Sequence, residues 1–158
     1  MSGLAAILLL SGALDVLIFA RTDCPISNRY APTIAKLQRD FAPRGVRIRL
    51  VYPEPGATLK SINEHQLAYG LQSIPAALDA KLERVRQAGV HVTPEAVVLA
   101  EDGRVVYRGR IDDRQASLRV ARAPQKRDLE EAIEDALAGR LPGLRATKAV
   151  GCAIEAIR

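Results

Sequence analysis

Cys24 is the residue whose type and surroundings best suit covalent chemistry in this sequence. It follows the apolar run 16–19 and precedes a segment with helical spacing, so a strand leads directly into a cysteine at a helix start. Pro25 is favoured at the first position of a helix, which predicts that Cys24 is the N-cap. A sulfur at an N-cap faces backbone N–H groups and the positive end of the helix dipole, and both favour thiolate over thiol. The sequence therefore predicts a nucleophilic thiolate at Cys24.

Three neighbouring side chains could tune that thiolate. Arg21 and Arg29 bring positive charge close to Cys24 along the chain and are expected to stabilise the thiolate. Ser27 either donates a hydrogen bond to the sulfur, as part of the catalytic group, or is an ordinary residue of the first helical turn. Both interpretations of Ser27 stay open at this point.

Cys152 is the other of the two cysteines in the chain. It is either a resolving thiol, which attacks the oxidised form of Cys24, or a chance residue on a tail. The stretch that follows Gly139 reaches far enough, because about twelve extended residues at ~3.3 Å each span roughly 40 Å. We expect oxidation to join Cys24 and Cys152, with the tail either docked beside Cys24 or mobile.

Composition narrows the class of protein. The chain has 158 residues, 48% of them hydrophobic, which is the composition of a folded domain. The net charge of +5 comes from scattered basic residues without interleaved aromatics, so we predict no nucleic-acid partner. The two cysteines form no CxxC pair, and His65 and His91 lie too far apart for a zinc-finger spacing. No cofactor and no metal site are predicted.

The N-terminal residues 1–14 have two interpretations. Leu4 to Leu10 is apolar and is followed by small residues, as in a secretory signal, but no lysine or arginine precedes Arg21. The segment is either a remnant signal or a buried first strand or helix. Asp15 interrupts the apolar run before it reaches membrane-spanning length, so no stable transmembrane anchor is predicted.

Apolar periodicity and turn residues divide the rest of the chain into alternating strands and helices. Strands are expected at 15–20, 46–52, 74–78, 95–100 and 104–111, and helices at 25–41, 58–70, 79–88 and 125–137. Pro32 should kink the first helix. The residues predicted to be buried on and just after the second helix are Leu59, Ile62, Leu67 and Leu71. Segment 112–124 is expected to be irregular. This order predicts an α/β fold with a mixed central sheet and helices on both faces.

Three local features resemble the thioredoxin fold. The cysteine lies between the first strand and the first helix, and Ala31-Pro32 follows it as at the helix kink of thioredoxins. Thr93-Pro94, directly before a strand and an Asp-Gly hairpin, looks like the family's cis-proline loop. The segment 58–88 resembles the helix–strand insertion that some relatives carry before this loop. The chain as a whole, over about 15–154, resembles bacterial redoxin-domain proteins of the thioredoxin-like superfamily, both peroxiredoxin-like and thiol-disulfide reductase-like.

That resemblance implies site residues and boundaries. In this fold the cis-proline loop lies against the active cysteine, so Thr93 and Pro94 would hold substrate backbone beside the sulfur. Arg108, on the last strand, either points toward the site and binds substrate or belongs to a solvated face. The thioredoxin-like domain is expected to span 15–139, followed by a C-terminal tail, 140–158, that carries Cys152.

Two departures from the family patterns separate the candidate functions. Ser27 stands where thioredoxins have their second cysteine, and Thr22 lies two residues before Cys24, where peroxiredoxins have a threonine three residues before. The first hypothesis is a thiol-disulfide oxidoreductase with Cys24 as nucleophile and Cys152 as possible resolving thiol. The alternatives are a peroxiredoxin-like thiol peroxidase with antioxidant activity and a non-catalytic copper-binding protein.

Partners and location follow from the resemblance as well. The expected partners are a protein or small-molecule disulfide, or a peroxide, as substrate and a thiol as reductant. Many such proteins are exported or attached to the cell envelope, so the envelope or periplasm is the favoured location, with the cytoplasm as the alternative.

Overall fold

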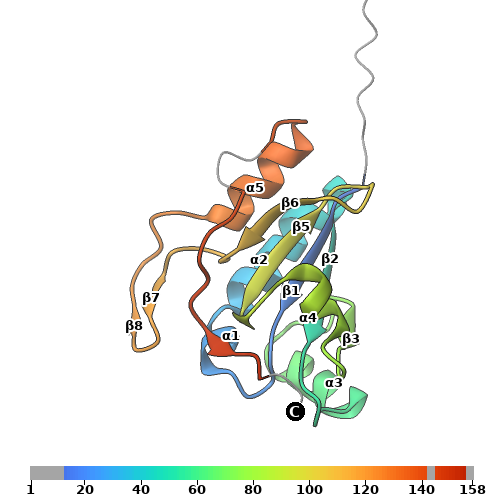
Figure 1. The fold of residues 1–158 in the computed structure, drawn as a ribbon, viewed down its shortest axis with the longest axis vertical. Coiled ribbons are helices and arrows are strands. Elements are labelled where there is room, and N and C mark those ends of the chain that lie inside the picture. The colour runs from blue at the N-terminus through green and yellow to red at the C-terminus, as the bar shows by residue number, and fades with distance from the viewer. Residues whose placement is uncertain (1–12, 142–144, 156–158) are drawn as a thin grey trace, which may run out of the picture.

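The central sheet has five strands and is mixed. The computed structural model describes residues 13–141 and 145–155, so the residues 1–12, on which the signal interpretation depends, lie outside the described part. The strands of the sheet are β1 (Asp15–Phe19), β2 (Arg47–Tyr52), β3 (Ala76–Leu78), β5 (Glu95–Leu99) and β6 (Val105–Gly109). Their order is β3-β2-β1-β5-β6, with parallel pairing from β1 through β2 to β3 and antiparallel pairing of β5 with β1 and β6 (Figure 1).

Helices and short strands surround this sheet. The helices are α1 (Pro25–Arg29), α2 (Ala31–Phe41), the 3₁₀ turn η1 (Ala42–Arg44), α3 (Leu59–Ala68), α4 (Glu83–Ala88) and α5 (Asp128–Leu137). The short strands are β4 (Val92–Thr93), β7 (Gln115–Ser117), β8 (Val120–Ala121) and β9 (Cys152–Ala153). The predicted α/β class and the predicted order of elements are confirmed.

The two faces of the sheet bury different clusters, because side chains alternate along each strand. Val16 and Ile18 of β1 belong to the larger cluster, which takes in apolar residues of α1, α2, α3 and α5. Phe19 belongs to the smaller cluster on the opposite face, where Val85 of α4 packs. The sheet is thus covered on both faces, as the sequence predicts (Figure 1).

The first helix is broken, and the break explains how the cysteine is presented. α1 ends at Arg29 and α2 begins at Ala31, with Tyr30 between them at φ −84° and ψ −8°. Pro32 has no N–H for the helical hydrogen-bond ladder, which accounts for an interruption here. The predicted kink is confirmed, and it leaves α1 as a short helix whose N-terminus carries Cys24.

The insertion helix α3 buries polar residues rather than the two leucines predicted. Leu59 and Leu67 are each 66% exposed, so their predicted burial is wrong, whereas Ile62 and Leu71 are buried. Gln66 is buried instead, because its amide donates to the carbonyl oxygens of Leu71 and Ile74 at 3.1 and 2.7 Å. Hydrogen bonds decide which residues of α3 are buried, and a hydrophobic pattern in the sequence does not show such bonds.

Two helices begin later than predicted, and in each case an aspartate carboxylate binds backbone N–H groups near the helix start. α4 begins at Glu83, and the buried carboxylate of Asp79 accepts hydrogen bonds from the N–H groups of Arg84 and Val85. α5 begins at Asp128, because the preceding N–H groups of Gln125 and Lys126 donate to Asp113.

The segment 112–124 contains an element that was not predicted. β7 and β8 form a small antiparallel hairpin, which stands out from the body of the molecule in Figure 1. Leu118 and Val120 are 64% and 54% exposed, so no alternation of buried and exposed residues marks these strands in the sequence.

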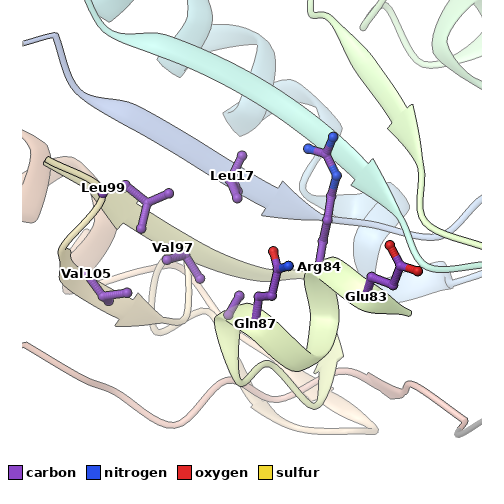
Figure 2. A pocket seen from close by; sticks show the side chains of 9 residues that line it. Leu17, Glu83, Arg84, Gln87, Val97, Leu99 and Val105 are labelled. Carbon is purple, nitrogen blue, oxygen red and sulfur yellow. The ribbon is translucent and has the colours of Figure 1, made fainter. Parts of the chain in front are cut away.

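The second face of the sheet has a hollow beside α4. Its volume is about 460 Å³, and Figure 2 shows the apolar side chains Leu17, Val97, Leu99 and Val105 with the polar Glu83, Arg84 and Gln87. Among the described residues, none of these side chains forms a hydrogen bond with Cys24 or Cys152. Within 13–141 and 145–155, no helix has the length and apolar character needed to cross a membrane.

Candidate active site

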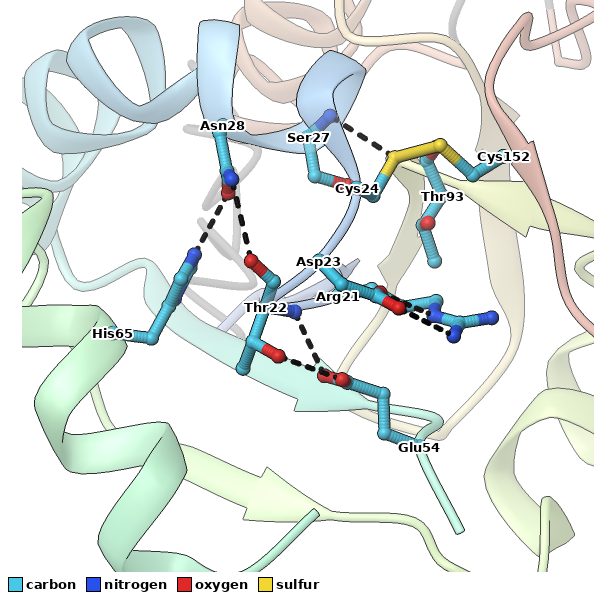
Figure 3. Close-up of a disulfide and its surroundings, with 10 residues drawn as sticks. All are labelled: Arg21, Thr22, Asp23, Cys24, Ser27, Asn28, Glu54, His65, Thr93 and Cys152. Carbon is cyan, nitrogen blue, oxygen red and sulfur yellow. Dashed lines mark hydrogen bonds and ion pairs between the residues drawn. A yellow bond between two sulfur atoms is a disulfide. The ribbon is translucent and has the colours of Figure 1, made fainter. Parts of the chain in front are cut away.

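Cys24 is the N-cap of α1, as predicted, and its sulfur is buried at the start of the helix. The residue is extended, with φ −92° and ψ 110°, and the N–H of Ser27 donates to the sulfur at 3.4 Å. The carbonyl oxygen of Thr93 lies 3.3 Å from the same sulfur, and the Cys24 residue is 1% exposed. Figure 3 shows the sulfur between the helix start and Thr93. The Ser27 N–H and the helix start favour a thiolate once the cysteine is reduced, whereas burial and the Thr93 carbonyl oppose it.

The sulfur of Cys24 is bonded to that of Cys152, and their Cα atoms lie 6.1 Å apart, in the usual range for disulfides. The predicted pairing is therefore present in the structure. Cys152 is only half-buried, in contrast to Cys24. Of the two arrangements expected for the tail, the structure has the docked one (Figure 1).

The tail is first held on β6. The N–H of Arg108 donates to the carbonyl of Arg145, and the N–H of Thr147 donates to the carbonyl of Arg108, both at 3.0 Å. The hydroxyl of Thr147 accepts a hydrogen bond from the N–H of Arg110 at 3.0 Å and bonds the Tyr107 hydroxyl at 2.7 Å. Gly109 makes this approach possible, since a Cβ there would meet the Thr147 backbone and the φ of +149° disfavours other residues.

The tail is held a second time at the predicted cis-proline loop. The Thr93-Pro94 peptide bond is cis, and Thr93 pairs with Cys152 where β4 and β9 run antiparallel. The N–H of Ile154 then donates to the carbonyl of His91 at 3.0 Å. The predicted position of Thr93 and Pro94 beside Cys24 is confirmed, and in this structure the chain's own tail lies along them.

A buried polar network supports the loop that precedes Cys24. Glu54 is buried, and its carboxylate accepts from the Thr22 N–H at 2.8 Å and from the Thr22 hydroxyl at 2.7 Å. Asn28 of α1 donates to the Thr22 carbonyl at 3.3 Å, and His65 Nε2 lies 2.8 Å from the Asn28 side-chain oxygen (Figure 3). Tyr52 completes the chain through its hydroxyl, 3.0 Å from His65 Nδ1. The network joins α1, β2 and α3.

The network assigns the protonation of His65. Because the Asn28 amide nitrogen donates to Thr22, the Asn28 oxygen is the acceptor for a proton on His65 Nε2. A neutral imidazole whose Nδ1 accepts from the Tyr52 hydroxyl satisfies both contacts. Burial lowers the pKa of His65 from its ordinary value, and the charge of Glu54 opposes that shift only in part.

Sequence reasoning did not predict this network. Glu54 and Asn28 were not candidate residues, and His65 was considered only for a zinc-finger spacing with His91, which was excluded. The available signal was the carboxylate of Glu54 in the loop directly after β2, at the same sheet edge as the loop after β1. Parallel neighbouring strands bring such loops together.

The predicted arginines do not all reach the disulfide. Arg21 makes two hydrogen bonds to Asp23, at 3.0 and 3.1 Å, so its charge is shared with a carboxylate (Figure 3). Arg29 is exposed on α1. The prediction that Arg108 lines the site is corrected: the residue pairs with Val97, which faces α4, and its guanidinium lies 3.4 Å from the carbonyl of Ala88.

Ser27 contacts the sulfur through its backbone, not through its hydroxyl. The Ser27 and Thr93 hydroxyl oxygens are buried beside the disulfide and have no hydrogen-bond partner among the described residues. A buried hydroxyl without a partner is uncommon. Both groups are thus available to a charged sulfur or to a bound substrate, and the prediction that the Ser27 hydroxyl donates to the thiolate stays a prediction.

The described part of the chain contains no group of three or more His, Cys, Asp and Glu side chains arranged to hold a metal ion. His91 lies near Cys152 in the chain pairing, but its side chain is exposed and both sulfurs are in the disulfide.

Comparison with known proteins agrees with this geometry. The family model described as Redoxin matches residues 10–124. Three solved structures are similar over most of the chain. A hypothetical protein from Sinorhizobium meliloti is 23% identical, with a TM-score of 0.80 and coverage of 94% of this chain and 82% of that one. A candidate thiol:disulfide interchange protein DsbE from Chlorobium tepidum is 20% identical, with a TM-score of 0.62 and coverage of 80% and 82%.

The third is a secreted disulfide oxidoreductase from Mycobacterium tuberculosis, 16% identical, with a TM-score of 0.53 and coverage of 80% and 81%. At these identities the solved structures establish the thioredoxin-like fold. No curated protein sequence matches the chain.

Proposed function

Because the chain belongs to the Redoxin family, we propose that it is a thiol-disulfide oxidoreductase whose Cys24 and Cys152 alternate between dithiol and disulfide. The observation that carries the proposal is the disulfide itself, which joins an N-cap cysteine to a tail cysteine beside a cis-proline loop. Proteins with this fold include a candidate thiol:disulfide interchange protein and a secreted disulfide oxidoreductase, which adds support.

The reaction conserves atoms and electrons within thiol-disulfide exchange. The Cys24 thiolate attacks one sulfur of a substrate disulfide, a mixed disulfide forms, and the other substrate sulfur leaves as a thiolate. The Cys152 thiolate then attacks Cys24, the second substrate sulfur leaves, and the internal disulfide forms. Two electrons pass to the substrate, and an external dithiol must return them to the protein.

The surroundings of Cys24 fit its role as attacking and leaving sulfur. The N–H of Ser27 and the positive end of α1 stabilise negative charge there, and we propose that the Ser27 hydroxyl adds a hydrogen bond in the reduced protein. Arg29 is the arginine of α1 whose charge adds to this field in our proposal. Thr93 and Pro94 are proposed to hold the substrate backbone.

The peroxidase alternative has weaker support from the side chains near the sulfur. A peroxidase needs donors aimed at the oxygen that Cys24 would attack. The hydroxyl of Thr22 donates to Glu54, and the guanidinium of Arg21 is bound to Asp23. These groups are engaged elsewhere, which favours disulfide exchange.

One competition experiment separates the three candidate functions. Fully reduced protein is mixed with one equivalent of hydrogen peroxide or of oxidised glutathione, and mass spectrometry follows the products over time. Faster formation of the Cys24–Cys152 disulfide with oxidised glutathione is the expected result. Faster sulfenylation of Cys24 by peroxide would instead assign a thiol peroxidase. Inertness toward both, with tight retention of Cu(I), would assign a copper-binding protein.

Two variants serve as controls for that experiment. Cys24→Ser should abolish both reactions, and Cys152→Ser should stop at a mixed disulfide on Cys24. We further propose an oxidising compartment such as the cell envelope as the location, because such compartments preserve disulfides.

A further inference from the structure

The edge strand β4 is paired with the chain's own tail. The residues of the tail that lie on β4 therefore indicate which peptide segments this edge can bind. β9 adds to β4 as an antiparallel strand, with Cys152 opposite Thr93 and its sulfur on Cys24. This is the arrangement of a peptide that has been captured through a cysteine and held by main-chain hydrogen bonds. Main-chain bonds give such a site affinity, and the fit of alternate side chains gives it selectivity.

The position before the cysteine has no room for a side chain. A Cβ built on Gly151 would meet the carbonyl of Thr93, which is the same carbonyl that lies 3.3 Å from the Cys24 sulfur. Gly151 is also buried, unlike the residues on either side of it. A substrate strand that adopts this register must therefore carry glycine directly before its cysteine.

An apolar surface selects the type of residue that stands two positions after the cysteine. Ile154 packs against the cluster that contains Leu82, Val85 and Val90. Together with Arg86, Gly89 and His91, these residues line a hollow of about 410 Å³. Ala153, between Cys152 and Ile154, is exposed, so the edge places no demand on that side chain.

We infer that the preferred substrate of this site is an extended segment with the pattern glycine, cysteine, any residue, aliphatic residue. This inference rests on the proposed function and specifies its substrate class. The cysteine of the segment takes the place of Cys152 on Cys24, and its backbone takes the place of β9 on β4. The chain's own tail, at 151–154, then has the same residue pattern as the proposed substrate.

One consequence concerns product release. The substrate and the resolving cysteine use the same edge, so Cys152 can attack Cys24 only as β9 replaces the substrate strand on β4. The Thr147 anchor on β6 keeps the tail within five residues of the edge while it is displaced. Formation of the internal disulfide and expulsion of the substrate strand are thereby one event.

Synthetic peptides test this directly. The probe is a copy of residues 147–156 whose cysteine carries 2-nitro-5-thiobenzoate as a mixed disulfide. Two matched peptides carry Gly151→Val or Ile154→Asp. Each is mixed with the reduced full-length Cys152→Ser protein. The Cys24 thiolate attacks the peptide sulfur, and the coloured thiolate that leaves reports the rate. Mass spectrometry confirms the peptide adduct on Cys24.

The parent peptide is expected to react at least about tenfold faster than either matched peptide, a difference of about 1.4 kcal/mol in activation free energy. Equal rates for the three peptides would overturn the inference and leave the proposed function intact. No adduct on Cys24 with any of them would overturn both.

A second protein variant tests the competition with the tail. Gly151→Val in the Cys152→Ser protein places a side chain against the Thr93 carbonyl and should drive the tail off β4. All three peptides should then react faster, and their ranking should persist. Unchanged rates would overturn the shared use of the edge.

Discussion

At the scale of single residues, the chemistry of Cys24 follows from what surrounds its sulfur. The Ser27 N–H donates to it, and the helix dipole of α1 is positive there. Cys152 has a half-buried position on a two-residue strand and no helix start beside it. The two sulfurs should therefore differ in acidity once they are reduced, with Cys24 the more acidic.

We predict that Cys24 in the reduced protein has an apparent pKa below ~8.5, the ordinary value for cysteine. The rate of alkylation by iodoacetamide as a function of pH measures this pKa in the Cys152→Ser variant. The Cys24→Ser variant gives the matching curve for Cys152. A Cys24 pKa at or above the ordinary value would remove the chemical basis of the proposed active site.

His65 provides a prediction about pH and stability. Burial lowers the pKa of His65 in the folded chain below the 6.5 that it has when unfolded. Between these two values the unfolded chain binds more protons, so the free energy of unfolding rises with pH. The stabilisation by neutral His65 is present above about pH 6.5 and is lost as the pH falls below it.

Urea unfolding between about pH 5 and pH 7 measures that slope. His65→Gln keeps a hydrogen-bonding side chain without the titration, so its free energy of unfolding should depend less on pH than that of the parent. If both proteins show the same slope, His65 does not titrate as the buried network requires.

At the scale of elements, the site is an assembly of helix and strand ends that the sequence only partly predicts. The strand before Cys24 and the kink near Pro32 were predictable from an apolar run and from the proline itself, and the loop at Thr93 from the resemblance to the thioredoxin fold. The network of Glu54, Asn28 and His65 was not, because partners far apart in the chain decide whether a polar residue is buried.

The sequence also did not predict which residues of the tail pair with β6 and β4. Nothing in the sequence around Gly109 and Gly151 marks them as special. Each is required because another segment passes so close that a side chain would not fit. The sequence likewise left open which way Arg108 points, since the pairing of β6 with β5 decides which of its residues face α4.

The anchor at Thr147 gives a prediction at this scale. Thr147→Val removes the oxygen that bonds the Arg110 N–H and the Tyr107 hydroxyl, at a cost of about 1 kcal/mol to the docked tail. That cost should slow formation of the internal disulfide from the mixed disulfide by about fivefold. Rapid acid quenching and mass spectrometry measure the rate. Thr147→Ser keeps the oxygen and should retain the parent rate, whereas a normal rate for Thr147→Val would exclude a positioning role.

At the scale of the whole molecule, the disulfide links two ends of the fold. Cys24 and Cys152 are 128 residues apart in the chain, so the bond closes a loop that includes all the described helices and every strand of the central sheet except β1. Chain entropy for a loop of this length corresponds to about 4–5 kcal/mol of stabilisation of the oxidised protein. Reduction should leave a folded but less stable molecule, because the tail adds only the partly buried Cys152 and Ile154 to the two apolar clusters.

Guanidinium unfolding of the oxidised and the reduced protein tests this expectation. The oxidised form should be the more stable by a few kcal/mol. The Cys152→Ser protein should unfold at the same guanidinium concentration with and without reductant. Equal stability of the oxidised and reduced parent would contradict the docked arrangement of the tail.

The order of events at the two sulfurs tests the account most directly. Reduced protein is mixed with excess oxidised glutathione, quenched with acid after milliseconds to seconds, and mapped by mass spectrometry. We predict that glutathione appears first on Cys24 and that the Cys24–Cys152 disulfide forms as this adduct decays. In Cys152→Ser the adduct on Cys24 should persist, and in Cys24→Ser no fast adduct should form. Glutathione that appears first on Cys152, or an adduct on Cys24 that never converts to the internal disulfide, would contradict the account.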